Sequence, residues 1–494
     1  MTRRCPQPLA GPRLAARRRP AAGPAALAAV VLLAGGWLSS PTPAGAARTG
    51  TSGSARGPAA HRPARAKLVF GPSLLRTPAV EVTTAPAGVS IEYPVLAAAM
   101  GGGGCPPPTL AAELARLGSP PLQVGGVSQD ETAPPGTLTQ PATSWQTATL
   151  YSLPAGFWGQ LHCLLSSTHE PLTIGLNMRT GNLAWATQMA TEARTAAVNG
   201  LSFSLANEPD LYDLPNYAAL DKPIAGEEAA DTSLYEQLGQ YLKPAAGSEP
   251  LVGPELAVAA RWRQLLPLVI RSLGLGTVGV HLYPLTTCRS DSETTIKGLL
   301  SRRAADSPAR LAWVAQAARA LGLPAIISEA NSASCGGLTG VSNTPAAGVW
   351  ALRFGISALE AGFEEVRYHF SGNSYDPFVV RGGQIYERPI GDALVALNTW
   401  LPVGTTLHPV PSKRLAAQGV VAHAALRPDG NVVLILDDEG TRPARVLLRG
   451  LPAAQLTLMS ASRTGLPARS VVSPTNQIPL SLAPNEIVAV TARL

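Results

Sequence analysis

Two glutamates stand where short apolar segments end, and together they could act on a single bond. Glu208 follows the run Leu201–Ala206, and Glu329 ends the run Ala325–Glu329. A protonated carboxyl group can give its proton to a leaving group, and an ionised one can attack the same centre. This chemistry requires a fold that carries both side chains to one cavity.

Eight short apolar segments alternate with helical stretches along the chain, and Glu208 follows the fourth while Glu329 ends the seventh. This alternation predicts a (β/α)8 barrel, with a doubly wound open sheet as the alternative. Strands four and seven of a barrel face each other across the mouth where active sites lie. The predicted strands are Val89–Tyr93, Leu122–Gly126, Leu172–Asn177, Leu201–Ala206, Leu251–Gly253, Thr277–Tyr283, Ala325–Glu329 and Glu365–Phe370.

Helices are predicted between these strands, and the last hundred residues change to a pattern of strands without a convincing helix. That pattern predicts a C-terminal all-β sandwich over 401–494, after a barrel over 86–400. Residues 67–85 include one alternating segment that we expect to join the sandwich as a strand. The helices are Pro108–Leu117, Trp185–Val198, Ser233–Leu242, Arg261–Leu273, Ala309–Leu321 and Ala346–Ala361; the late strands are Val432–Asp437, Ala444–Leu448, Leu456–Met459 and Glu486–Ala492.

The N-terminal residues 1–46 have the pattern of a signal peptide. Arg17–Arg19 supplies the charged region, Ala25–Ala34 is apolar but too short to span a bilayer, and cleavage is expected after Ala46. A retained signal anchor is the alternative. Residues 47–66 are rich in Gly, Ala, Ser, Arg and Pro, which predicts a disordered linker. We therefore expect a secreted protein with no stable membrane span after cleavage.

The positive net charge of the chain is confined to this leader. Residues 1–66 hold ten arginines and no acid, which leaves 29 basic and 32 acidic residues in the remainder. A folded region with a net charge near −3 lacks the basic footprint of a nucleic-acid-binding protein. We therefore expect no nucleic-acid partner.

Four cysteines remain after the leader, and an even number in an exported chain favours disulfides. Three pairings are possible, and free buried thiols are the alternative. Cys288 follows strand six and Cys335 follows strand seven, so the loops after adjacent strands predict this bridge and leave Cys105 to pair with Cys163. The seven histidines show no metal-ligand spacing, and no phosphate-binding glycine loop is present, so neither metal nor cofactor is expected.

Several motifs in residues 67–494 resemble glycoside hydrolases of clan A, and most closely family 79, the β-glucuronidase and heparanase-like group. The segment Ser328–Gly337 is the most specific of them. Two positions depart from the family, because Gln123 stands where Arg is usual and Val127 where Asn is usual. The motifs are Ser90–Pro94, Gly125–Asp130, Gly175–Asn177, Asn207–Tyr212, His281–Pro284 and Ser328–Gly337.

This resemblance implies a retaining β-glycosidase, most closely a β-glucuronidase that acts on a uronic-acid-containing glycan or glycoside. It implies that Glu329 is the nucleophile and Glu208 the acid/base. It also implies that Asn207 bonds the sugar 2-hydroxyl and that Tyr283 orients the nucleophile, although a packed aromatic is the alternative for Tyr283.

Further polar residues near the strand ends are candidate sugar ligands. Gln129 and Asp130 follow strand two, although a plain turn is as good an interpretation. His281 shares a strand face with Tyr283 and either contacts the substrate or supports the site. Asn331 and the pair Tyr368–His369 are candidates to meet a uronate carboxylate.

Two other functions compete with this interpretation. An endo-β-glucuronidase of the heparanase type would need a basic cleft, which a net charge near −3 does not favour. A non-catalytic carbohydrate-binding protein is opposed by the presence of both glutamates.

Overall fold

The computed structural model describes residues 65–493 except 138–150, 212–226, 290–291 and 382–383. The predicted signal peptide (1–46) lies outside the described residues, as does all of the predicted linker except its last two residues. The linker prediction ran one residue too far, because Ala66 already begins strand β1 (Ala66–Val69). No helix of the described residues is long and apolar enough to cross a membrane.

Eight parallel strands of the described chain close into a barrel, so the predicted (β/α)8 fold is confirmed. Each predicted segment coincides with one strand, and β14 pairs with β3 to close the ring. The strands are, in ring order, β3 (Ala87–Glu92), β4 (Leu122–Gly125), β7 (Leu172–Gly175), β8 (Leu201–Ser204), β9 (Leu251–Leu256), β10 (Thr277–Leu282), β12 (Ala325–Ala330) and β14 (Glu365–Phe370).

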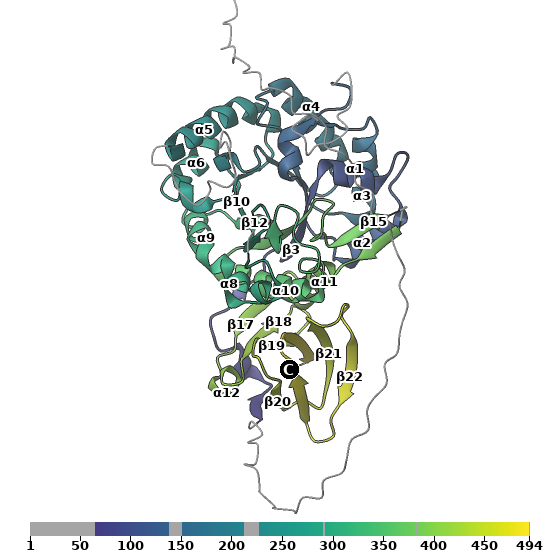
Figure 1. The fold of residues 1–494 in the computed structure, drawn as a ribbon, viewed down its shortest axis with the longest axis vertical. Helices are drawn as coiled ribbons and strands as arrows, with labels where there is room; N and C mark the ends of the chain where they lie inside the picture. The colour runs from purple at the N-terminus through teal and green to yellow at the C-terminus, as the bar shows by residue number, and fades with distance from the viewer. Residues whose placement is uncertain (1–64, 138–150, 212–226, 290–291, 382–383, 494) are drawn as a thin grey trace, which may run out of the picture. The chain divides into compact units, whose positions relative to one another are not determined.

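Helices between the strands surround the barrel (Figure 1). Two predicted helices are interrupted. A 3₁₀ turn η6 (Ala259–Trp262) precedes α6 (Leu266–Leu273), whose Pro267 lacks an N–H and therefore suits the first turn, and η7 (Ser307–Leu311) precedes α9. The other helices are α1 (Tyr93–Met100), α2 (Pro108–Arg116), α3 (Phe157–Thr168), α4 (Leu183–Ala196), α5 (Glu227–Ala246), α7 (Ile296–Leu299), α8 (Arg302–Ala305), α9 (Ala312–Arg319), α10 (Pro345–Ala361) and α11 (Pro389–Trp400).

Polar side chains occupy part of the barrel interior. The alternation along β14 places Glu365, Arg367 and His369 on one face of the strand. Arg367 donates to Glu365 at 2.9 Å and to Gln123 at 2.7 Å. Barrel interiors are usually filled by Val, Ile and Leu, so these buried polar groups must satisfy one another.

The C-terminal residues form a sandwich of two sheets, and the predicted late strands are all present. One sheet has the order β1-β20-β23 and the other β2-β17-β18-β19-β24-β21-β22. A short helix α12 (Lys413–Ala416) contradicts the expectation that no helix occurs here. The remaining strands are β2 (Val80–Glu81), β17 (Thr406–Pro409), β18 (Val420–Leu426), β19 (Asn431–Asp438), β20 (Ala444–Arg449), β21 (Ala453–Ser460), β22 (Ala468–Val472), β23 (Gln477–Leu482) and β24 (Glu486–Arg493).

Strand β19 is buried on both faces and links the sandwich to the barrel. Leu434 and Leu436 pack in the sandwich core, whereas Val433 and Ile435 belong to the core of the barrel. Burial on both faces explains why this strand is continuously apolar. Beside it, Arg353 of α10 holds the carboxylate of Asp437 with two hydrogen bonds of 2.6 and 2.7 Å.

Both predicted disulfides are present. Cys288 is bonded to Cys335 with a Cα–Cα distance of 5.2 Å, and Cys105 to Cys163 at 5.5 Å. The loops that carry Cys288 and Cys335 also pair as two short strands, β11 (Leu285–Thr286) and β13 (Ala333–Ser334). The segments after β10 and β12 are therefore joined covalently and by backbone pairing.

Truncation of a β19 side chain should destabilise the protein. We expect Leu434→Ala to lower the free energy of unfolding by about 3 kcal/mol, because it removes buried methyl groups and leaves a cavity. Urea unfolding followed by circular dichroism measures this change. The control is Val472→Ala, at a position that is 79% exposed and should change stability by no more than about 0.5 kcal/mol.

Candidate active site

The backbone after β8 turns sharply and presents Glu208 at the barrel mouth. Glu208 has a positive φ of 49°, its N–H donates to the carbonyl of Glu255, and its own carbonyl accepts from Leu211. Asp210 fixes the same turn by accepting from the N–H groups of Ala257 and Val258 after β9. A left-handed conformation is unfavourable for a residue with a side chain, so these bonds must hold it.

Glu329 is the penultimate residue of β12 and is buried, with 4% of its surface exposed. Its Oε1 accepts a hydrogen bond of 2.8 Å from the Tyr283 hydroxyl. Its Oε2 accepts none within the described residues and lies 3.4 Å from Nδ1 of His369. Burial raises the pKa of Glu329, although the charges of His369 and His281 oppose this shift. Chemistry that needs ionised Glu329 should therefore fail as the pH falls through this raised pKa.

The two predicted catalytic carboxylates face one cavity of ≈ 560 Å³ that both residues line. A carboxylate oxygen of Glu208 lies within 4.8 Å of one of Glu329. Carboxyl groups about 5–5.5 Å apart suit attack by one of them and proton transfer by the other, whereas a wider gap leaves room for a water. The geometry therefore fits double displacement.

His281 joins Glu208 to a third, deeply buried carboxylate. Its Nδ1 lies 3.0 Å from Glu208 and its Nε2 2.9 Å from Glu255, which is 1% exposed. Burial disfavours the imidazolium, but Glu329, Glu208 and Glu255 outweigh it and raise the pKa of His281 well above its usual value. Burial also opposes the charge of Glu255, but His281 lowers the pKa of that carboxyl. His281 and Glu255 therefore form an ion pair below the mouth.

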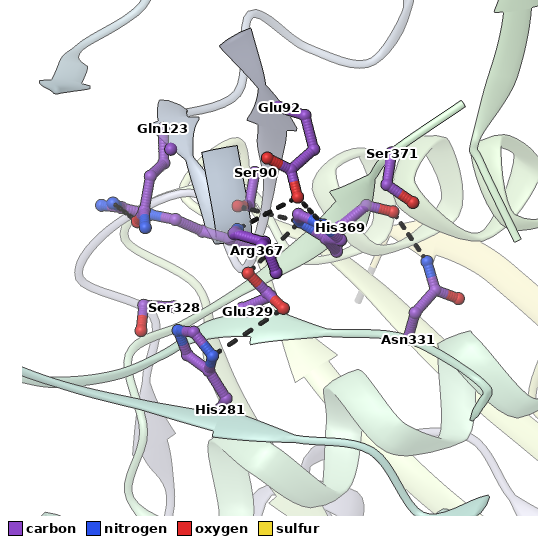
Figure 2. Close-up of polar contacts among 12 residues, drawn as sticks. Ser90, Glu92, Gln123, His281, Ser328, Glu329, Asn331, Arg367, His369 and Ser371 are labelled. Atoms are coloured by element: carbon purple, nitrogen blue, oxygen red, sulfur yellow. Dashed lines mark hydrogen bonds and ion pairs between the residues drawn. The ribbon is translucent and has the colours of Figure 1, made fainter. Parts of the chain in front are cut away.

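A second histidine reaches Glu329 from the other side. Figure 2 shows His369 between Glu92 and Glu329, with its Nε2 3.2 Å from Glu92. Glu92 also accepts from the N–H groups of Val127 and Ser128. Burial disfavours the charged ring, but Glu329 and Glu92 raise the pKa of His369 overall. Glu329 therefore lies between two histidine rings whose pKa values are both raised.

Two of the predicted sugar ligands form hydrogen bonds to backbone groups of the scaffold. Gln129 is buried, and its amide donates to the carbonyls of Leu176 and Ser204. Asn331 is also buried, and its amide donates to the carbonyls of His369 and Tyr375. Neither residue is among those that line the cavity, so their sugar contacts stay predictions.

The other predicted residues divide between the cavity and its surroundings. Tyr283 lines the cavity and holds Glu329, as expected of an orienting phenol. His281 is 2% exposed and supports the carboxylates. Asn207 and Asp130 are buried and are not among the residues that line the cavity, so their sugar contacts stay predictions. Tyr368 donates to the carbonyl of Ala351, away from the site.

Three carboxylate and phenol side chains of the site were not predicted from the sequence. Glu92 lies inside the motif Ser90–Pro94 but was given no role. Glu255 follows Gly253, where the predicted fifth strand stopped three residues too early. Tyr375 lines the cavity from the loop after β14. Both glutamates lie close to the end of a predicted strand, and this position is the signal by which they could have been found.

Glu208, His281 and Glu329 also have the spacing of a metal-binding group, with donor atoms within 4.8 Å of one another. Metal ligands must be deprotonated, and a histidine ligand must be neutral. His281 instead directs both ring nitrogens at carboxylates, Nδ1 at Glu208 and Nε2 at Glu255. These residues fit an ion-paired acid/base site better than a metal centre.

No protein-family model matches the sequence, and no curated protein sequence matches it either. Solved structures do match. A 4-O-α-L-rhamnosyl-β-D-glucuronidase from Fusarium oxysporum has a TM-score of 0.60 and 19% identity, over 86% of this chain and 100% of that chain. A GH51 arabinofuranosidase from Xanthomonas axonopodis pv. citri has a TM-score of 0.59 and 14% identity, over 84% and 97% of the two chains.

A GH30 endoxylanase from Clostridium papyrosolvens is similar over 87% of this chain and 100% of its own, with a TM-score of 0.53 and 10% identity. Because the identities are this low, the similarity shows the shared fold alone, a (β/α)8 barrel with accessory β-sheets. The barrel with its paired glutamates has the architecture of a glycoside hydrolase.

The His281–Glu255 pair gives a direct electrostatic prediction. We expect Glu255→Gln to lower the pKa of His281, because the change removes a negative charge 2.9 Å from its ring. NMR titration of the histidine ring protons measures this, with the His281 signal assigned through His281→Asn. Glu360→Gln, next to His423 on the far side of α10, is the control and should leave His281 unchanged. An unchanged His281 pKa in Glu255→Gln would contradict the ion pair.

Proposed function

We propose that this chain is a retaining β-glycosidase. The observation that carries the proposal is the pair Glu208 and Glu329, which lie within 4.8 Å at the ends of strands four and seven in one cavity. Their environments differ, because Glu329 is buried against two histidines and a phenol while the side chain of Glu208 is 17% exposed. Different environments suit different roles for two carboxyl groups.

In the first step, Oε2 of Glu329 attacks the anomeric carbon while Glu208 gives its proton to the departing oxygen. A covalent glycosyl ester forms, and the bond to the leaving group breaks. The Tyr283 hydroxyl donates a hydrogen bond to Oε1 of Glu329. Oε2 accepts no hydrogen bond from the described residues, so its lone pairs are available for the attack. The phenol stays neutral as a donor, because burial and the charge of Glu329 raise the pKa of Tyr283.

In the second step, Glu208 takes a proton from water, and the resulting hydroxide displaces Glu329 from the sugar. Formation of the ester removes one negative charge from the pocket, which favours the ionised form of Glu208 that this step needs. The sugar is released with retained configuration.

We further propose that the enzyme is secreted and is a β-glucuronidase that releases terminal glucuronic acid. The motifs around Glu208 and Glu329 support this, and so does the similarity to the solved 4-O-α-L-rhamnosyl-β-D-glucuronidase. His369 is the one basic side chain among the described residues that line the cavity, and its raised pKa supplies positive charge for a uronate. The leader and the two disulfides support export.

A panel of 4-nitrophenyl β-glycosides tests the reaction and the sugar together. We expect hydrolysis of the glucuronide but not of the glucoside, galactoside or xyloside, and loss of detectable turnover in Glu329→Ala. Glu208→Ala should slow hydrolysis by about 10²–10⁴-fold for a glucuronide with a poor leaving group. With the activated 4-nitrophenyl glucuronide the covalent ester still forms, so azide should restore turnover and yield a β-glycosyl azide.

Three outcomes would contradict this proposal, and each has a different meaning. Hydrolysis of a neutral glycoside alone would contradict the glucuronidase assignment and keep the mechanism. An α-configured azide product would overturn the retaining mechanism, and no hydrolysis of any β-glycoside would favour a carbohydrate-binding protein.

Removal of the Tyr283 hydroxyl should reduce turnover. We expect Tyr283→Phe to lower kcat by about 10–100-fold, because a hydrogen bond to a charged group contributes about 1.5–3 kcal/mol. Steady-state kinetics with the nitrophenyl glucuronide measures this. Tyr368→Phe is the matched control, since it also loses a buried hydrogen bond but leaves the cavity intact, and its kcat should stay within about twofold.

A further inference from the structure

A second cavity lies beside the catalytic one at the barrel mouth. It has a volume of ≈ 600 Å³ and is lined by residues that follow β14 and β3, such as Gly372 and Pro94. Ser371 and Asn373 line both cavities. A ligand in the catalytic cavity could therefore extend past these two residues into the second.

The ring of strands shows which part of a substrate would extend this way. Counted in either direction around the barrel, β14 is four strands from β8, so the two strands lie on opposite sides of the mouth. Glu208 follows β8 and must face the leaving group. The second cavity, which follows β14, therefore lies on the side of the glycone, the part of the substrate that becomes attached to Glu329.

The second cavity differs from the catalytic one in its charge. Arg381, at the end of β15 (Phe378–Arg381), and Arg388 both line it, and neither forms an ion pair within the described part of the chain. Arg388 donates to the carbonyl of Asn373, which holds its guanidinium at the boundary between the cavities. Burial and the neighbouring charge of Arg381 lower the pKa of Arg388, whereas Asp376 opposes this.

One acid faces these two cations. Asp376 is buried in the lining and accepts from the N–H of Ser371. Burial raises the pKa of Asp376 to about 7, so near neutral pH its carboxyl group is only partly ionised. The cavity therefore carries an excess of positive charge in guanidinium groups, which bind carboxylates and sulfates through paired N–H donors.

We propose that Arg381 and Arg388 bind an anionic group, a carboxylate or a sulfate, on a second sugar attached to the non-reducing side of the scissile unit. This subsite rests on the proposed glycosidase function and extends its substrate class from terminal glucuronic acid to a glucuronic acid unit that carries a second, acidic sugar. Arg388 is fixed by Asn373 and recognises the group at short range, while the exposed Arg381 adds charge at the rim.

Binding to an inactive enzyme tests the subsite without relying on catalysis. Calorimetry with Glu329→Ala would compare three disaccharides that share a glucuronic acid unit and carry on it a uronic acid, a sulfated hexose or a neutral hexose. We expect at least one acidic disaccharide to bind about tenfold more tightly than the neutral one, with the two acidic arms showing which anion is preferred. Added Arg381→Gln and Arg388→Gln should bring all three to the same affinity.

Conservative and remote variants separate charge from structural damage. Arg381→Lys, which keeps the charge, should retain most of the preference, and Arg271→Gln on the exposed face of α6 should retain all of it. In the active enzyme, Arg271→Gln should leave kcat/KM for the unsubstituted nitrophenyl glucuronide within about twofold, because Arg271 lies outside both cavities.

Equal binding of the acidic and neutral disaccharides by the Arg-containing protein would overturn the subsite, as would a preference that survives both arginine changes. Failure of the proposed function looks different. In that case no β-glucuronide would be hydrolysed by the enzyme with Glu329 intact, whereas an arginine-dependent preference in binding would still be measured.

Discussion

Repulsion between carboxylates is the constraint on which this site depends. Two carboxylates within 4.8 Å repel by about 3–4 kcal/mol at an effective dielectric constant near 20, and Glu255 and Glu92 add further negative charge close by. The protein opposes this repulsion with two buried histidines. The ring of His281 contacts Glu208 and Glu255, and the ring of His369 contacts Glu329 and Glu92. Each ring therefore lies between two carboxylates.

The polar barrel interior follows from this constraint. A histidine that is charged and buried needs partners that are themselves held, since a single unpaired ion would be costly. Gln123 contacts both Glu255 and Arg367, and Arg367 in turn contacts Glu365. Polar contacts thus continue from the mouth into the barrel, which explains why several inward positions are not aliphatic as in most barrels.

The loops after the strands are fixed by equally specific contacts. Asp210 ties the turn of Glu208 to the segment after β9, and the disulfide between Cys288 and Cys335 joins the segments after β10 and β12. Each of these contacts connects neighbouring strands, so the reactive groups are held to the barrel and to one another. Such fixation matters because an error of about 1 Å in the placement of a catalytic group can cost a large factor in rate.

The sequence by itself determined the barrel, the sandwich, both disulfides and the places of Glu208 and Glu329, because periodicity and strand order are local properties that fix which residues reach the mouth. Only the tertiary structure decided which polar residues near the mouth face the cavity. Gln129 and Asn331 satisfy backbone groups of other strands, whereas Glu92, Glu255 and His369 complete the charge balance. These assignments depend on hydrogen bonds between segments that are far apart in the chain. Which buried polar group needs which partner cannot be read from the periodicity of a sequence.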